Sequence, residues 1–309
     1  MNELILLAGE ALYDLVLDED GRLDAHAGGG PFNTARTVGR LRRPVAFLGR
    51  LSTDRFGTTM ERMLADEGVR LDAVVRTDEP TTLAVAELDA TASARYRFYA
   101  QGTSAPGLTR EAALQALPAD VAILHVGTLG LTLEPMATAI EAVVEQLADT
   151  AMVVVDPNCR PSLISDPNAY RERLTRVLHR AHVVKVSDDD VAWLDPGRPP
   201  PQAARALLAD GPSVALLTRG AQGALVITPD DRIPINVPAA HVVDTIGAGD
   251  AFGGGFLAWW SLRGLTAQDV ADTAKVVDAA RFAAQVASRT VERAGASPPY
   301  LSELEAPAS

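Results

Sequence analysis

The chain has 309 residues, of which 47% are hydrophobic and 22% charged, and its formal net charge is −12. This composition is typical of a globular protein, and the length allows two domains or one large α/β domain with additions. The acidic balance, without any block of Lys or Arg, argues against nucleic acid or an anionic membrane as a partner.

The single cysteine, Cys159, excludes an intrachain disulfide and fits a reducing compartment. No apolar run approaches the ~20 residues that a membrane-spanning helix needs. The first residues, MNELILLAG, lack the basic start of a signal peptide. We therefore expect a cytoplasmic protein that makes no contact with membranes.

Short apolar segments, typical of buried strands, alternate with amphipathic segments that predict helices. The predicted strands are 4–8, 45–48, 121–126, 151–155, 182–186, 214–217 and 224–227. The predicted helices lie near 32–41, 55–67, 135–147, 169–178 and 270–287. This alternation predicts an α/β fold with a mostly parallel central sheet covered by helices on both faces.

Two segments interrupt this alternation and predict β-hairpins. Residues 13–27 alternate around a turn at 19–21, and residues 81–99 contain two strand-like runs around a polar turn. Because both flank the glycine-rich loop at Gly28, we expect a small β-sheet lid that keeps water from a reacting phosphate. A decorative edge hairpin is the alternative. The tail from Ser297 is expected to be loosely held.

The most informative motif is DTIGAGDAFGGG, residues 244–255. Its glycines allow several backbone N–H groups to converge near the start of a helix at Gly249, an arrangement that binds an anion without a lysine. Asp250 then lies where negative charge is expected, which indicates phosphoryl transfer. The alternative is a glycine-rich turn with a capping aspartate. The run of three glycines at 253–255 favours a backbone that approaches something closely.

Two other loops have the features of a binding site. Residues 28–33, GGGPFN, open a helix and suit close backbone approach to a polyol, with Asn33 as hydrogen-bonding partner. A simple turn explains them equally well. Residues 156–160, DPNCR, follow a predicted strand at the edge where α/β sheets bind ligands, and Arg160 suits a phosphate oxygen.

Two further loops follow predicted strands near the C-terminal half. Ser187 and Asp190 form a helix-capping pattern, while the acids 188–190 are also able to organise Mg²⁺ through water. The TRGAQG segment, 218–223, is either a hairpin turn or a phosphate loop. The five histidines show no spacing that suggests zinc.

Together these motifs resemble the PfkB, or ribokinase-like, family of carbohydrate kinases. The resemblance covers nearly the whole chain in order and is most specific in the motif at 244–255. Within the family, DPNCR and KVSDDD are most similar to fructokinases. The resemblance implies a Rossmann-like, three-layer α/β/α domain with a β-sheet lid. The lid would be 12–31 and 79–102, and the main nucleotide- and substrate-binding domain 1–11, 32–78 and 103–309.

The resemblance also implies roles for individual residues. Among the catalytic positions, Asp250 is the base. Gly247, Ala248 and Gly249 form the anion hole, and Arg160 lies near the substrate or phosphate. The sugar-binding positions are Asp14, Gly29, Gly30, Asn33 and Asp250. The nucleotide-binding positions are Lys185, Ser187, Thr218, Gly220, Gly223, Gly249 and Ala280, the last from the stretch that walls the adenine. Cation positions are Asp190 for Mg²⁺ through water, and Asp244 and Thr245 for a monovalent cation.

Three positions depart from the family pattern. Many members have Asn-x-x-Glu where this chain has Ser187 and Asp190, and the shorter Asp weakens the expectation for Mg²⁺. Arg42 replaces the usual glycine after the first helix, which we expect to change a helix cap rather than the chemistry. Cys159 lies inside a motif, and a buried filler residue is its simplest interpretation.

The leading hypothesis is an ATP-dependent, fructokinase-like sugar kinase that transfers the γ-phosphate to a primary hydroxyl, using ATP, Mg²⁺ and a candidate K⁺. A nucleoside kinase of the adenosine type shares the same motif and is the nearest alternative. A non-catalytic sugar-binding regulator is a third, and it would have no need of the intact GAGD. An oxidoreductase is disfavoured, because the first strand leads into AGEALYD rather than a Gly-x-Gly-x-x-Gly turn. Family analogy suggests a homodimer formed through the lid.

Overall fold

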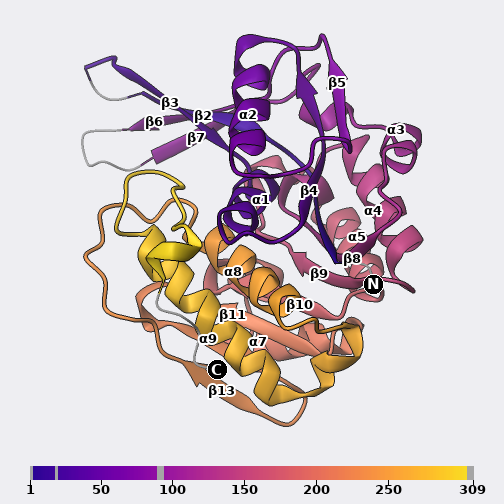
Figure 1. The fold of residues 1–309 in the computed structure, drawn as a ribbon, viewed down its shortest axis with the longest axis vertical. Coiled ribbons are helices and arrows are strands. Elements are labelled where there is room, and N and C mark those ends of the chain that lie inside the picture. Colours follow the sequence, from indigo (N-terminus) through magenta and orange to yellow (C-terminus); the bar gives the residue numbers. More distant parts are fainter. Residues whose placement is uncertain (1–2, 18–19, 89–93, 305–309) are drawn as a thin grey trace.

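The computed structural model describes residues 3–17, 20–88 and 94–304 (Figure 1). Its strands are β1 (Leu4–Ala8), β2 (Leu12–Leu17), β3 (Leu23–Gly28), β4 (Val45–Ser52), β5 (Val74–Thr77), β6 (Leu83–Leu88), β7 (Ala94–Tyr99), β8 (Val121–Gly127), β9 (Met152–Asp156), β10 (Val183–Ser187), β11 (Val214–Thr218), β12 (Ala224–Ile227) and β13 (Arg232–Ile235). Its α-helices are α1 (Gly30–Arg40), α2 (Arg55–Asp66), α3 (Arg110–Gln115), α4 (Met136–Leu147), α5 (Pro167–Leu178), α6 (Asp188–Leu194), α7 (Pro200–Ala206), α8 (Ala248–Leu262) and α9 (Thr273–Thr290).

Within these residues, nine strands form one sheet in the order β13-β12-β11-β10-β9-β8-β1-β4-β5. Neighbours from β5 to β11 pair in parallel. In the described part of this sheet, only the β11–β12 and β12–β13 pairs are antiparallel. The expected α/β fold with a mostly parallel sheet is therefore confirmed.

Both faces of this sheet are buried, as the apolar runs predict. Along β1, Leu4, Leu6 and Ala8 face one core with α3 to α7, while Ile5 and Leu7 face a second core with α1, α2, α8 and α9. Successive side chains of a strand point to opposite faces, so a strand between two layers of helices must be apolar throughout. The result is the three-layer arrangement that the sequence predicts.

The two interrupting segments form a second, smaller sheet in the order β3-β2-β6-β7. Each segment is an antiparallel hairpin, and the two hairpins join through parallel pairing of β2 with β6. This sheet projects from one side of the molecule in Figure 1. The hairpin turns at 18–19 and 89–93 lie outside the described residues.

The last predicted helix begins later than its hydrophobic pattern suggests. Residues Ala267–Ala271 form a separate 3₁₀ turn, and the carboxylate of Asp272 then caps α9 by accepting from the N–H groups of Ala274 and Lys275. An aspartate that satisfies these free N–H groups fixes where a helix begins.

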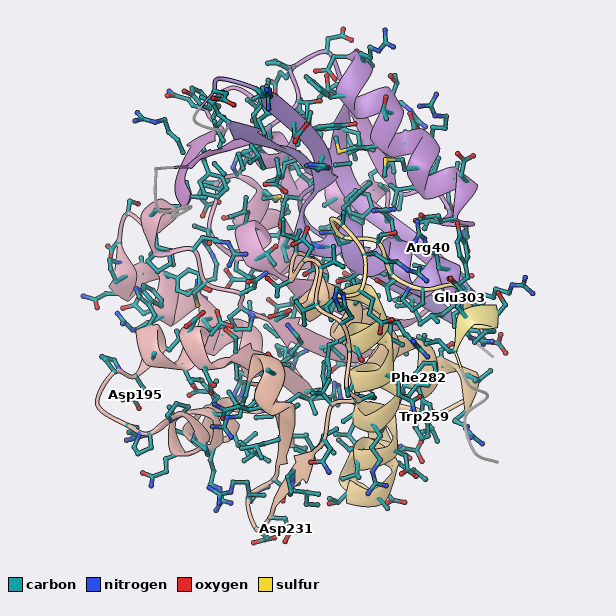
Figure 2. All side chains as sticks on the ribbon, turned by 90° about the vertical axis from the view of Figure 1, so that its left-hand side faces the viewer. Arg40, Asp195, Asp231, Trp259, Phe282 and Glu303 are labelled. Atoms are coloured by element: carbon teal, nitrogen blue, oxygen red, sulfur yellow. The ribbon has the colours of Figure 1, made fainter. Side chains whose placement is uncertain are left out.

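The prediction of a loose tail is wrong for the described residues up to 304. Arg40 of α1 donates to the carbonyl of Pro298 at 2.5 Å, and its guanidinium lies over the ring of Tyr300 at 4.8 Å. Glu303 pairs with Arg293 at 2.5 Å, and Arg40 and Glu303 lie near each other in Figure 2. None of the described helices combines the length and apolarity needed to cross a membrane.

Candidate active site

The first turn of α8 directs backbone amides to one place. Gly247, which precedes the helix, has φ 76° and ψ 2°, a left-handed conformation that suits glycine. The backbone amides of Gly249 and Asp250 donate no hydrogen bond to any described residue. The amide of Ala248, in contrast, donates to the carbonyl of Thr245 at 3.3 Å. Free amides and the positive end of the helix favour an anion here.

Asp250 lies in this first turn, partly buried, against the start of α1. The side-chain amide of Asn33 donates to its Oδ2 at 2.9 Å. Burial raises the pKa of Asp250 to about 6, and the Asn33 amide and the Lys185 ammonium oppose this rise. A carboxylate with this pKa accepts a proton more readily than an ordinary aspartate, whose pKa is near 3.9.

The glycines before α1 allow close packing within the protein. A Cβ atom at Gly28 would lie 2.2 Å from Oδ2 of Asp14, and one at Gly30 would lie 2.6 Å from Cγ2 of Thr128. The same Cβ at Gly30 would lie 3.4 Å from Oδ1 of Asp250. The glycine loop, Asp14 and Asp250 are therefore brought together, as the sequence predicts for a substrate pocket.

Glu10, which sequence reasoning missed, joins three segments beneath this loop. Its carboxylate accepts from the amide of Gly30 at 3.2 Å, from the amide of Gly130 at 3.2 Å and from the hydroxyl of Thr128. Thr128 has φ 52°, which is strained for a β-branched residue. Gly29 is needed beside it, because φ is 106° and a Cβ would lie 2.7 Å from the Glu10 carbonyl. Burial raises the pKa of Glu10 to about 7.

Arg160 carries a positive charge that acts on two carboxyls of the candidate site, Asp14 and Asp250. It is exposed and donates to Oδ1 of Asn158 at 2.6 Å. Burial raises the pKa of Asp14 to about 6, while the charges of Arg160 and His26 oppose that rise. Arg160 acts in the same sense on Asp250. Its guanidinium is thus placed to attract an anionic group towards both carboxyls.

Lys185, a predicted nucleotide-binding residue, is buried in β10. Its side chain is 6% exposed, and its ammonium donates to Oδ2 of Asp156 at 2.5 Å. A Cβ at Gly249 would lie 3.4 Å from the Lys185 Nζ. His125 is buried nearby, with no hydrogen-bond partner for either ring nitrogen among the described residues, and burial lowers its pKa to about 3.

The capping interpretation of Ser187 and Asp190 is confirmed. Oδ2 of Asp190 accepts from the Ser187 amide at 2.8 Å and from its hydroxyl at 2.6 Å, while Oδ1 accepts from the amide of Cys159 at 2.6 Å. Both oxygens of this buried carboxylate therefore already accept hydrogen bonds, and its expected role with Mg²⁺ through water stays a prediction. Cys159 is buried, and burial raises its pKa to about 12.

The TRGAQG segment is the turn between the antiparallel strands β11 and β12. Gly220 and Gly223 have φ of 52° and 82°, and a Cβ at Gly223 would lie 2.2 Å from the carbonyl of Ile235. Thr218 lies beside Ser187 in the register of β10 and β11. The hairpin interpretation is confirmed, and a phosphate contact at Thr218 and Gly220 stays a prediction.

Ala280 is wrongly placed for the predicted nucleotide contact. It lies in α9 with no exposed surface, inside the core between α9 and its neighbours. The glycines of α8 explain this tight packing. A Cβ at Gly254 would lie 2.5 Å from Cβ of Thr37, and one at Gly255 would lie 3.0 Å from Cα of Ala283. The close approach predicted for these glycines is thus made to helices α1 and α9.

Asp244 ties the loop before α8 to the segment after α9. Its Oδ1 accepts from the amide of Ile246 at 3.0 Å, and its Oδ2 accepts from the amide of Gly295 at 2.8 Å. Thr245 beside it is exposed. A monovalent cation at Asp244 and Thr245 stays a prediction. The described residues contain no group of three or more His, Cys, Asp or Glu side chains arranged to hold a metal ion.

The residues missed from the sequence follow a common rule. Glu10 comes after β1 and Thr128 after β8, so both lie at the carboxyl edge of the parallel sheet, as does the predicted loop at 156–160 after β9. Ligands of open α/β sheets bind at this edge. The segments AGEALYD and GTLG were the available signals, because each places polar or glycine residues directly after a buried strand.

Comparisons with known proteins place the chain in a family. The profile described as "pfkB family carbohydrate kinase" matches residues 2–303. A fructokinase of Rhizobium leguminosarum bv. trifolii is 34% identical over 260 residues, which cover 82% of this chain and 79% of the relative.

Two solved structures have the same fold over nearly the whole chain. The fructokinase of Xylella fastidiosa with bound ATP is 29% identical, with a TM-score of 0.90 and coverage of 98% and 97% of the two chains. The fructokinase of Vibrio cholerae O395 with fructose, ADP and calcium ion is 28% identical, with a TM-score of 0.83 and coverage of 95% and 94%. From its motifs, fold and relatives, the chain is a sugar phosphotransferase and belongs to the pfkB family of carbohydrate kinases.

Proposed function

We propose that this chain is an ATP-dependent, fructokinase-like kinase that phosphorylates a primary hydroxyl of a small carbohydrate. The observation that carries the proposal is the position of Asp250. It lies in the first turn of α8 beside free backbone amides, and the side-chain amide of Asn33 holds one of its oxygens at 2.9 Å.

In the proposed step, Asp250 takes the proton of the sugar hydroxyl while the hydroxyl oxygen forms a bond to the γ-phosphorus. The bond from the γ-phosphorus to the bridging oxygen breaks, and ADP leaves. Positioning and electrostatics supply most of the rate in such transfers. The amides of Gly247, Ala248 and Gly249 would stabilise the charge on the transferring group, although that of Ala248 must first leave the Thr245 carbonyl.

The proposed sugar site consists of Asp14, Gly29, Gly30, Asn33 and Asp250. Gly30 and Asn33 lie next to the Asp250 carboxylate, Asp14 lies beside Gly28, and Arg160 would bind an anionic oxygen of the substrate or phosphate. The pocket has both hydrogen-bond donors and acceptors, as a polyol requires. Fructose is the first candidate, because the relatives described above are fructokinases and one of them holds fructose with ADP.

ATP is the proposed donor, since a relative of the same fold holds it. When bound with ATP, Mg²⁺ neutralises charge on the phosphates. Asp190 stays proposed as a contact of Mg²⁺ through water, because its three hydrogen bonds leave room on Oδ1 for one further donor. Ser187, Thr218 and Gly220 stay proposed for the nucleotide side, and Asp244 with Thr245 for K⁺.

We also propose that the small sheet is a lid over the sugar, with 12–31 and 79–102 as its limits. Its outer strands expose Leu23 and Tyr99, at 56% and 54%, which would suit pairing of two copies through the lid. We propose the cytoplasm as the compartment, because ATP is available there and a lone cysteine stays reduced.

A coupled ADP-release assay with Mg-ATP and K⁺ tests the function. The acceptors are fructose, other hexoses, ribose, 2-keto-3-deoxygluconate and adenosine. We expect turnover with fructose or a related sugar, and a loss of about 10³-fold in kcat for Asp250→Asn. Asp278→Asn, which changes an exposed aspartate of α9, is the matched control and should retain full activity.

The outcomes separate the alternatives. Turnover with adenosine but not with sugars would replace the proposal by a nucleoside kinase. Sugar binding without ADP release at saturating Mg-ATP would indicate a sugar-binding regulator. Near wild-type kcat in Asp250→Asn would contradict the role of the base.

A further inference from the structure

A buried ion pair lies directly beneath the first turn of α8. The Lys185 ammonium donates to Oδ2 of Asp156 at 2.5 Å, and the two side chains are 6% and 3% exposed. A Cβ at Gly249 would come within 3.4 Å of the Lys185 nitrogen. The cation therefore sits against the backbone of the residue that immediately precedes Asp250.

The choice of lysine at this position is unusual for the chain. Of its 28 basic residues, only Lys185 and Lys275 are lysines. A lysine ammonium is a compact point charge with three donors, whereas an arginine presents a broad, planar group. Among the described residues, Asp156 accepts the single hydrogen bond of Lys185. Its charge is thus left to act on the other carboxylates nearby.

Several charged groups face Asp250 from the surrounding elements. Lys185 of β10 and Arg160 after β9 are cationic, Asp156 of β9 and Glu10 after β1 are carboxyls, and Asn33 of α1 is a neutral donor. His125 of β8 faces Lys185 and is uncharged near neutral pH, because burial lowers its pKa to about 3.

Lys185 keeps its charge in this environment. Burial by itself lowers the pKa of Lys185, but Asp156, Asp250 and Asp190 outweigh burial and raise that pKa above its ordinary value. A buried cation that remains charged favours the ionised form of a nearby carboxyl. The aspartate that must accept a proton would otherwise be held neutral by burial.

We propose that Lys185 is a positioning residue, whose buried charge keeps Asp250 ionised and fixes the first turn of α8, rather than a ligand of the nucleotide. The inference rests on the proposed role of Asp250 as base. On this proposal, the Lys185–Asp156 pair sets the pH at which kcat/KM falls on the acid side of its pH profile.

The test compares pH profiles of kcat/KM for the wild type and Lys185→Met. Loss of the cation should move the acid limb upward by about one pH unit. The ratio of wild-type to variant kcat/KM should then be about tenfold larger at pH ~5 than at pH ~9. A nucleotide ligand would instead raise the KM for ATP and leave the acid limb in place, and that result would overturn the proposal.

Asp156→Asn provides a control of opposite sign. Asp156 raises the pKa of Asp250, so its removal should move the acid limb downward. A purely structural effect of either change would lower activity evenly with pH, which would also overturn the proposal. Lys275→Met removes the other lysine, whose side chain is 38% exposed, and should leave the profile unchanged.

A direct titration of Asp250 separates this inference from the proposed function. The carboxyl carbon of Asp250 is assigned by NMR from the signal lost in Asp250→Asn, and its titration is followed in the wild type, Lys185→Met and Asp156→Asn. Opposite shifts in the last two support the inference even if no acceptor sugar is phosphorylated. Where Lys185→Met does not fold, the downward shift in Asp156→Asn decides, and an unchanged titration there contradicts the role of the pair.

Discussion

The side-chain amide of Asn33 donates a 2.9 Å hydrogen bond to Oδ2 of Asp250, across 217 positions of sequence. One residue lies in the first turn of α1 and the other in the first turn of α8. The two helix starts therefore meet at the carboxyl edge of the sheet, which is where the proposed phosphoryl transfer would take place.

Removal of this hydrogen bond should impair activity more than stability. In Asn33→Ala the Asp250 carboxylate loses the donor that orients it, and the sugar loses a partner. A hydrogen bond to a charged group corresponds to a loss of about 10- to 100-fold in kcat/KM. Because Asn33 opposes the rise in the pKa of Asp250, the acid limb should also move upward. Steady-state kinetics against pH measure both effects, with exposed Asn168→Ala as the control.

Glu10 should make the protein more stable as pH falls from 8 towards 6. Its folded pKa of about 7 lies above the unfolded value of 4.5. Folding therefore favours the protonated form, and the stabilisation is lost as pH rises through the folded value. Between pH 8 and pH 6 the gain is about 1 kcal/mol.

Glu10→Gln checks this contribution. The variant should lack that part of the pH dependence in urea unfolding, and its KM for the sugar should rise, because the new NH₂ group opposes the amides of Gly30 or Gly130. An identical pH dependence in the two proteins would contradict the prediction.

Two neighbouring glycines of α8 should respond oppositely to alanine. At Gly254 the new Cβ would lie 2.5 Å from Thr37, so overpacking costs about 1–3 kcal/mol and exceeds the gain in helix propensity. At Gly253 the nearest atom would be 3.8 Å away, so the propensity gain of about 1 kcal/mol remains. Chemical denaturation of both variants measures the difference, and equal effects would show that packing against α1 is not limiting.

Arg42→Gly should stabilise the protein. Arg42 has φ 58° after the end of α1, in a helix-ending motif where the Arg42 amide bonds the Gly39 carbonyl and the Arg43 amide bonds that of Val38. A non-glycine residue in this conformation costs about 1 kcal/mol. A thermal melt should show Tm higher by about 2 °C. Arg43→Gly, without a positive φ, should not raise Tm.

The sequence predicted the elements well where local pattern determines them. The apolar runs of β1, β8, β9, β10 and β11 lie between two layers of helices, which is why their interiors are apolar apart from the buried His125 and Lys185. The hairpins at 13–27 and 81–99 both form as predicted, as β2 with β3 and as β6 with β7. The family motif at 244–255 located Asp250 and the first turn of α8.

The errors arose where distant segments meet. The burial of Ala280 and the close contact of Gly254 with Thr37 depend on how α1, α8 and α9 pack, which no local pattern records. The burial of Lys185 depends on Asp156 in the neighbouring strand. Glu10 was missed because its partners, Thr128 and Gly130, lie more than a hundred residues away in sequence.

The order of the elements has a consequence for synthesis on the ribosome. All described strands of the nine-stranded sheet are complete by Ile235, yet α8 and α9, which cover much of one sheet face, follow at Ala248 and Thr273. A nascent chain that stops before α8 would leave Val226 of β12 and Ile235 of β13, which α9 covers, exposed to water, and would be prone to aggregate. Such a truncated product should be recovered with chaperones or in inclusion bodies, because its strands are synthesised before the helices α8 and α9 that cover them.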